Sequence, residues 1–173
     1  DAETEAARQG RPSGITAKMN SLQDRGIIDK LYEASAAGVP VRLVVRGICC
    51  LRPGVEGLSE SIEATSIVDR FLEHSRIFLF HADGADKLYL GSADWMTRNL
   101  NRRVEVAFPI YDPDVRSELL HVLDLQCADN TKARTIDEHQ RNEFAPDTGG
   151  ATKRSQFDTY RYLSELLADH PGS

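Results

Sequence analysis

The stretch Asp24-Arg-Gly-Ile-Ile-Asp-Lys-Leu-Tyr-Glu-Ala-Ser-Ala-Ala-Gly-Val-Pro-Val-Arg-Leu-Val-Val-Arg-Gly47 decides the fold class. Asp24 is a good helix N-cap, and the apolar residues that follow it recur at helical spacing, namely Ile27, Ile28, Leu31 and Tyr32. Gly38 and Pro40 end this helix, and the β-branched run at 41–47 predicts a strand. A helix followed at once by a strand predicts an α/β layer with a parallel sheet.

Further elements are predicted on both sides of this unit. The segments 71–80 and 87–95 predict two strands of an antiparallel hairpin around Asp83-Gly84. A short helical pattern is expected within 62–72, a last strand at 104–110, a helix from Asp112-Pro113, and a final helix at 156–168. Residues 130–154 lack apolar periodicity. The first 20 residues are polar with Gly10, Pro12 and Gly14, so we expect an N-terminal linker or loop at 1–20, one domain at 21–168 and a tail at 169–173.

The composition of the chain excludes several classes of protein. At 173 residues with 40% apolar and 28% charged side chains, it is long enough for one domain with a core. No apolar run approaches the roughly 20 residues of a membrane span, and a net charge of −6 argues against general nucleic-acid binding. Its three cysteines suggest neither a disulfide framework nor a zinc site, which favours a cytoplasmic protein, at most peripherally associated with a membrane. The chain opens at Asp1 without a methionine, so we expect it to be part of a longer protein.

Three residues are the main candidates for a phosphate site. His74 and Arg76 lie at the mouth of an apolar strand, two residues apart, so in a strand they share one face. A guanidinium offers a planar fork to two phosphate oxygens, and an imidazole can move a proton near neutral pH. Glu73 is a possible orienting carboxylate for His74. Arg46 ends the first predicted strand just before Gly47, where open α/β sheets bind ligands. The simpler alternatives are a solvated arginine and a hydrogen-bonded structural histidine.

A second candidate region follows Trp95. Basic and amide side chains gather in a predicted loop, where they could form a phosphate or polyphosphate rim: Arg98, Asn99, Arg102 and Arg103. Ser92 and Asp94 could support that pocket. The alternative is a solvated turn.

Five motifs together resemble one family. They are Lys18-Met-Asn-Ser-Leu22, Val45-Arg-Gly-Ile-Cys-Cys-Leu-Arg-Pro-Gly54, Ser66-Ile-Val-Asp-Arg-Phe-Leu-Glu-His-Ser-Arg76, Ser92-Ala-Asp-Trp-Met-Thr-Arg-Asn-Leu100 and Arg103-Val-Glu-Val106. The chain resembles the last catalytic domain of bacterial polyphosphate kinase of the long-chain, histidine-phosphorylating type. This resemblance implies a phospholipase-D-like fold, with a mixed sheet flanked by helices, as one half of a paired two-domain site.

The resemblance also implies an activity and its partners. The family reversibly transfers the terminal phosphate of ATP to polyphosphate, with Mg²⁺, through a phosphohistidine held in the preceding domain. It implies His74 as the catalytic histidine that faces this phosphohistidine, and Arg46 as a nucleotide-binding residue, with Arg76 binding phosphate more loosely. The implied partners are ATP or ADP, inorganic polyphosphate, the other domains of the enzyme and further copies in a homo-oligomer. The chain alone would be incomplete, and we expect no metal ligands within it.

The sequence departs from the phospholipase-D pattern His-x-Lys-x-x-x-x-Asp. Arg76 stands in place of the lysine and His81 in place of the aspartate. Two alternatives stay open at this point: half of a phospholipase-D-type phosphodiesterase or phosphatidyltransferase, and a non-catalytic module for polyanion binding or oligomerisation.

Overall fold

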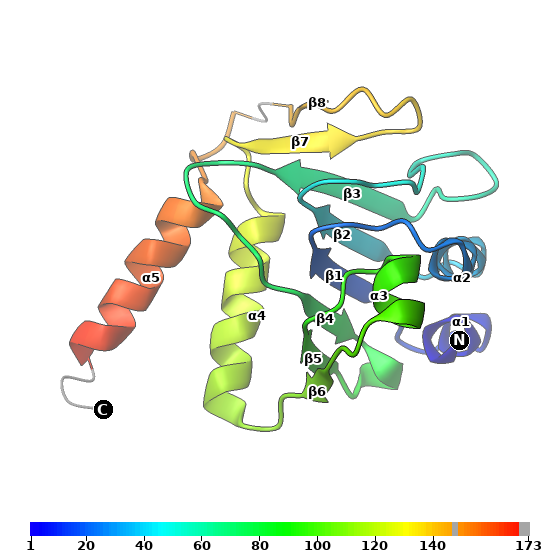
Figure 1. The fold of residues 1–173 in the computed structure, drawn as a ribbon, viewed down its shortest axis with the longest axis horizontal. Helices are drawn as coiled ribbons and strands as arrows, with labels where there is room; N and C mark the ends of the chain where they lie inside the picture. Colours follow the sequence, from blue (N-terminus) through cyan, green and yellow to red (C-terminus); the bar gives the residue numbers. More distant parts are fainter. Residues whose placement is uncertain (147–148, 170–173) are drawn as a thin grey trace.

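The computed structural model describes residues 1–146 and 149–169, with five α-helices and one sheet among them (Figure 1). The elements are, in chain order, α1 (Ala2–Arg8), β1 (Ile15–Met19), α2 (Arg25–Ala36), β2 (Val41–Val45), β3 (Ile62–Ile67), β4 (Ile77–Phe80), the 3₁₀ turn η1 (Ala82–Gly84), β5 (Lys87–Gly91), α3 (Thr97–Arg102), β6 (Ala107–Pro109), α4 (Pro113–Cys127), β7 (Ala133–Ile136), β8 (Glu143–Phe144) and α5 (Ser155–Asp169).

Within the described residues the strands form one mixed sheet of eight in the order β6-β5-β4-β1-β2-β3-β7-β8. β1, β2 and β3 are parallel, whereas β4 is antiparallel to β1 and β7 is antiparallel to β3. The expected hairpin is confirmed, since β4 pairs antiparallel with β5 from Ile77 to Phe80. The mixed sheet with helices on both faces confirms the predicted α/β class.

Helices lie on both faces of the sheet, with α1 and α2 on one face and α4 on the other (Figure 1). Side chains on one face of β1 and β2, such as Ala17 and Leu43, form the main core with Leu31 of α2. On the opposite face, Ile77 of β4 packs against Leu123 of α4. α5 contacts α4 and extends away from the sheet.

The starts of α2 and α4 are predicted well because their caps are local. The carboxylate of Asp24 accepts a hydrogen bond from the Ile27 N–H, and that of Asp112 accepts from the N–H groups of Asp114 and Val115. Pro113 occupies the first helical position of α4, where its missing N–H costs nothing. α5 begins one residue earlier than expected.

The prediction of a loop over residues 1–20 is wrong. This segment contains α1 and β1, and β1 lies in the middle of the sheet, hydrogen-bonded to β2 on one side and β4 on the other. The glycines and Pro12 mark the connection between the two elements. The run Ile15-Thr-Ala-Lys-Met19 alternates apolar and polar residues as a strand does, but this signal is only five residues long within a polar segment.

Four other expectations are corrected. Residues 62–67 form β3 and not a helix, because Ile67 and Val68 only mimic helical spacing beside Phe71 and Leu72. The supposed loop at 98–103 is largely helix α3. The strand expected at 104–110 is shorter, as β6. The polar stretch 130–154 contains β7 and β8, while residues 147–148 within it lie outside the described residues, as do 170–173 of the predicted tail.

The search for membrane spans covered the described part of the chain. None of its helices is long and apolar enough to cross a bilayer.

Candidate functional site

The sheet topology brings the ends of five strands to one edge. The parallel strands β1, β2 and β3 end there, β4 begins there because it runs antiparallel to β1, and β5 ends there. The Gly91 N–H donates to the Arg76 carbonyl at 3.2 Å, which joins the last two of these ends. We call this edge, with Lys18, Asn20, Arg46, residues 73–76 and Asp94, the cationic edge.

Arg46 lies at the cationic edge, as the sequence predicted, and it is half-buried. Its Nε donates to Asn20 Oδ1 at 2.9 Å, which fixes the direction of the guanidinium. Gly47 donates its N–H to the Asn20 carbonyl at 2.9 Å, and a Cβ at position 47 would lie 3.1 Å from that oxygen. The glycine is therefore needed for the approach of the neighbouring backbone that sets Asn20 beside Arg46.

Arg76 is not on a strand face with His74, because β4 begins only at Ile77. Its Nε and Nη2 each lie 3.1 Å from an oxygen of Asp94, and Nη1 donates to the His74 carbonyl at 2.8 Å. The side chains of Arg76 and Asp94 are only 10% and 8% exposed. The guanidinium is thus committed to the protein interior, and the expectation of a freely available phosphate fork at Arg76 is corrected.

Asp94 is the acceptor that joins three strand ends. Its Oδ1 also accepts from the backbone N–H of Asn20 at 2.8 Å and from the Asn20 side-chain amide at 3.2 Å. Burial alone would raise the pKa of Asp94, but the hydrogen bonds from Arg76 and Asn20 together outweigh it and hold the pKa below its ordinary value. The carboxylate is therefore charged, and it orients both Asn20 and Arg76.

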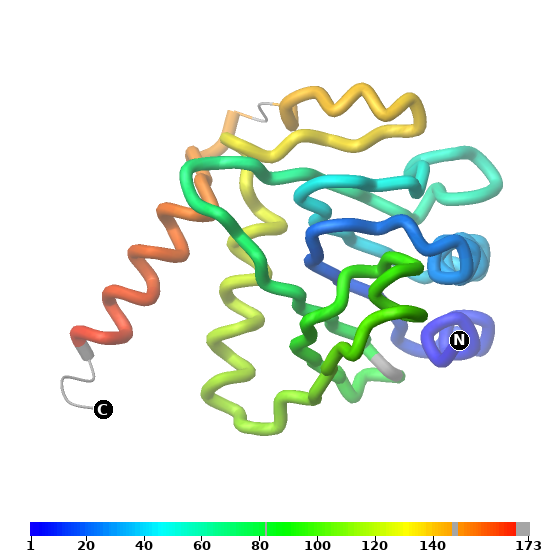
Figure 2. The backbone as a smooth tube through the Cα atoms, in the orientation of Figure 1, coloured from blue at the N-terminus to red at the C-terminus, as the bar shows by residue number. Residues whose placement is uncertain are grey.

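His74 is exposed within the irregular segment between β3 and β4, which runs past α4 (Figure 2). The described hydrogen bonds include none between Glu73 and the His74 ring, so the expected orienting contact is not seen. Glu73 instead contacts Gln126 and Lys18. Gln126 of α4 donates to Glu73 Oε2 at 2.6 Å, and Lys18 Nζ lies 3.5 Å from the same oxygen. The imidazole of His74 therefore faces solvent at the cationic edge.

Lys18 is a functional candidate that reasoning from residue types missed, although it opens one of the resembling motifs. It is 2% exposed, on the α4 side of β1, and donates to Ser75 Oγ at 2.7 Å. Desolvation lowers its pKa against the opposing effect of Glu73, and the positive charges of Arg46 and Arg76 lower it further. Glu73 and Asp94 offset two of the three cations of this edge, Lys18 and Arg76, so Arg46 is the cation left to attract an anionic ligand.

The residues of the predicted rim lie in α3 or directly after it, and they differ in exposure. Arg98, Arg102 and Arg103 are exposed, as a phosphate rim requires, but Asn99 is 2% exposed. The Asn99 amide donates to Glu105 Oε1 at 2.6 Å, and Ser92 donates to the other oxygen of the same carboxylate. Asn99 is thus a structural residue, and its place in the rim is corrected.

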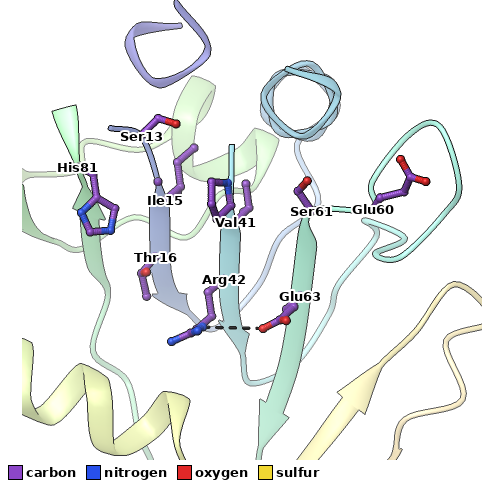
Figure 3. A pocket seen from close by; sticks show the side chains of 11 residues that line it. Ser13, Ile15, Thr16, Val41, Arg42, Glu60, Ser61, Glu63 and His81 are labelled. Atoms are coloured by element: carbon purple, nitrogen blue, oxygen red, sulfur yellow. Dashed lines mark ion pairs between the residues drawn. The ribbon is translucent and has the colours of Figure 1, made fainter. Parts of the chain in front are cut away.

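A hollow at the opposite edge of the sheet has a different character (Figure 3). It has a volume of about 410 Å³, and two of its charged groups face each other, with Arg42 Nε 3.9 Å from Glu63 Oε2. His81 is also here, beyond the far end of β4, with Nδ1 2.8 Å from Asp86 Oδ1. The residue at the acidic position of the phospholipase-D pattern is thus separated from His74 by the length of β4.

Comparison with known proteins decides the family. The family model described as polyphosphate kinase C-terminal domain 2 matches residues 1–156. The chain belongs to this family. It is 48% identical over 166 residues to a polyphosphate kinase of Escherichia coli strain K12, and 48% identical over 171 residues to a polyphosphate kinase of Halalkalibacterium halodurans. These alignments cover 96% and 99% of the chain but 24% and 22% of those proteins.

Solved structures agree with the fold. A polyphosphate kinase from Porphyromonas gingivalis superposes with a TM-score of 0.93 and 42% identity, over 97% of the chain and 26% of that protein. A phospholipase D family member, Nuc from Salmonella typhimurium, superposes with a TM-score of 0.54 and 16% identity, over 78% of the chain and 88% of that protein. The polyphosphate kinase C-terminal domain therefore has a phospholipase-D-like fold, and the chain spans about a quarter of the length of the polyphosphate kinases it matches.

Proposed function

We propose that this domain is one wall of the active site of an ATP:polyphosphate phosphotransferase, which reversibly moves the terminal phosphate of ATP to polyphosphate through a phosphohistidine in another domain. The observation that supports this proposal best is the cationic edge itself, where the exposed His74, just before β4, and Arg46, just after β2, lie at the same edge of the sheet in a member of the polyphosphate kinase family. Phosphoryl transfer needs chiefly positioning and stabilisation of charge on oxygen, and both groups can supply these.

Each group has a defined role in this proposal. Arg46, held by Asn20, binds a phosphate of the nucleotide. His74 faces the phosphohistidine and donates a proton or a hydrogen bond to the transferring group. Arg76 supports the backbone of His74 through its Nη1, and Arg98, Arg102 and Arg103 form an outer rim for polyphosphate.

The carboxylates of the cationic edge do not fit the Mg²⁺ that the family implies. The oxygens of Asp94 are taken by Arg76 and Asn20, and Glu73 accepts from Gln126. Among the described residues, no cluster of three or more histidine, cysteine or acidic side chains is arranged to hold a metal ion. We therefore propose that Mg²⁺ enters with ATP and is held outside these residues.

The proposal also covers the setting of the enzyme. The chain matches only about a quarter of the length of its relatives, which supports the presence of further domains in the same enzyme, and we propose that one of them provides the opposite wall. We further propose that the enzyme works in the cytoplasm, where ATP is available, and that it forms a homo-oligomer.

Substitution of His74 in the longer enzyme tests this function. His74→Ala should reduce ATP-dependent polyphosphate synthesis by about 100- to 10,000-fold, as expected for loss of a catalytic proton donor. His139→Ala is the matched control, because His139 is also exposed and lies in the segment after β7. Near-normal synthesis by His74→Ala would exclude the assigned role, and diester or lipid turnover without ATP would favour a phospholipase-D-type activity instead.

A further inference from the structure

Lys18 is a cation in the centre of the sheet, where a charge is costly. It sits in β1 between Val44 of β2 and Ile77 of β4, with 2% of its surface exposed. Desolvation of an ammonium destabilises the folded state unless hydrogen bonds compensate for it. A methionine at this position would pack against the same neighbours without that cost, so the charge itself calls for an explanation.

The contacts of Lys18 converge on the two residues that flank His74. Its Nζ donates to Ser75 Oγ at 2.7 Å and lies 3.5 Å from Glu73 Oε2. One ammonium thus holds the residue before His74 and the residue after it. His74 itself is left exposed between them.

The segment that carries His74 needs such an anchor. Residues 68–76 have no regular secondary structure, and Val68, Phe71 and Leu72 are 65%, 58% and 73% exposed. Its first half is tied to α5, because Arg154 pairs with Asp69 and Gln156 exchanges two hydrogen bonds with the Phe71 backbone. Among the described side-chain hydrogen bonds, the one from Lys18 is what holds Ser75.

We propose that Lys18 is a positioning residue for His74, acting through Glu73 and Ser75 without touching the phosphate. This inference rests on the proposed function of His74. The burial of Lys18 keeps its ammonium away from a ligand in solvent, and its donors point at protein oxygens. Displacement of a reacting group by about 1 Å can cost roughly 100-fold in rate, so a fixed segment matters for transfer.

The experiment compares stability with turnover in the longer enzyme. Lys18→Met removes a desolvated charge but also takes a partner from Glu73, whose side chain is 21% exposed and keeps its hydrogen bond from Gln126, so the melting temperature should change little. The value of kcat should nevertheless fall about 10- to 100-fold, with KM for ATP changed less than about twofold. Lys30→Met is the control, since Lys30 is an exposed lysine of α2 paired with Glu33. Full kcat in Lys18→Met would overturn the proposal, as would a loss confined to KM.

A second pair of variants decides the matter if Lys18→Met fails to fold. Ser75→Ala removes the acceptor from an exposed residue, and Ser75→Thr keeps the hydroxyl. Ser75→Ala should lower kcat and Ser75→Thr should retain most of it. Equal rates in these two variants would overturn the proposal.

The His74→Ala background separates this inference from the proposed function. If Lys18 acts through His74, then Lys18→Met and Ser75→Ala cause no further loss in that background. Full additivity there would overturn the role of Lys18 and leave that of His74 intact. Normal turnover of His74→Ala alone would reject the function of His74, and the role of Lys18 with it.

Discussion

The guanidinium of Arg76 and the carboxylate of Asp94 form a buried two-pronged ion pair, with two N···O distances of 3.1 Å. The pair ties the start of β4 to the end of β5, and the hydrogen bonds from Asn20 extend it to the end of β1. This geometry makes Arg76 a support of the cationic edge, and it separates the contribution of Arg76 to stability from that of His74 to chemistry.

Loss of Arg76 should therefore destabilise the domain strongly. Arg76→Ala leaves the Asp94 carboxylate buried without its partner, so we expect the free energy of unfolding to fall by about 3–5 kcal/mol. Chemical denaturation measures this, with the exposed Arg103→Ala as control. A change of less than about 1 kcal/mol in the free energy of unfolding of Arg76→Ala would show that the ion pair is not needed for stability. Arg76 would then again be a candidate for phosphate binding.

Asp129 should govern stability in acid. Its Oδ1 accepts from the N–H groups of Thr131, Lys132 and Ala133, and its Oδ2 from that of Ser155, so it joins the start of β7 to that of α5. Burial alone would raise its pKa, but these hydrogen bonds outweigh it and lower the pKa from 3.8.

Because the folded pKa of Asp129 is depressed, its contribution to stability is present above about pH 3.8 and is lost as the pH falls through the folded value. Asp129→Asn should thus lower the free energy of unfolding at pH 7 and reduce its dependence on pH below 4. Urea unfolding across pH 3–7 checks both effects. If the free energy of unfolding of Asp129→Asn falls as steeply below pH 4 as that of the unchanged domain, other carboxylates cause the loss of stability in acid.

The exposed arginines of α3 should contribute to polyphosphate binding through charge. Arg98→Ala and Arg102→Ala in the longer enzyme should each weaken binding modestly, and more at low salt than at high salt, because exposed charges are screened. Arg161→Ala on α5 makes the same change of charge elsewhere. Asn99→Ala should instead lower thermal stability, since it removes the partner of Glu105. Unchanged polyphosphate binding in both Arg98→Ala and Arg102→Ala would remove the rim from the site.

The 173 residues alone should fold but not synthesise polyphosphate. The cationic edge contains an exposed imidazole and cations but, in our proposal, the phosphohistidine belongs to another domain. Circular dichroism and an ATP-dependent synthesis assay on the isolated domain test this together. Robust synthesis by the folded domain would mean that the nucleophile is within this chain.

How much of the fold the sequence predicts depends on how local the signal is. α2 and α4 are marked by Asp24 and Asp112, whose side chains cap N–H groups two or three residues away. β1 carries a short local signal, the apolar–polar alternation from Ile15 to Met19, but its central place between β2 and β4 is set by pairing that no local pattern reports. Lys18 in it resembles a surface residue until the fold places Ser75, 57 residues later, beside it.

The candidate site follows the same division. The position of Arg46 can be predicted because it requires only the strand before it and the glycine after it. The partners of Arg76 and Glu73 cannot be predicted, because the sequence does not show which of many polar groups lies close to each side chain. The catalytic role of His74 stays a prediction, and the contacts of its neighbours, Ser75 with Lys18 and Glu73 with Gln126, depend on three-dimensional packing that the sequence does not show.

The central position of β1 has a practical consequence for shortened versions of this protein. A chain that began at Ser21, the domain boundary predicted from the sequence, would lose α1 and β1 and not merely a linker. It would lack the strand that joins β6-β5-β4 to β2-β3-β7-β8, and with it Lys18 and Asn20. The two half-sheets would expose unpaired edges suited to aggregation, so expression of such a truncation should yield insoluble protein.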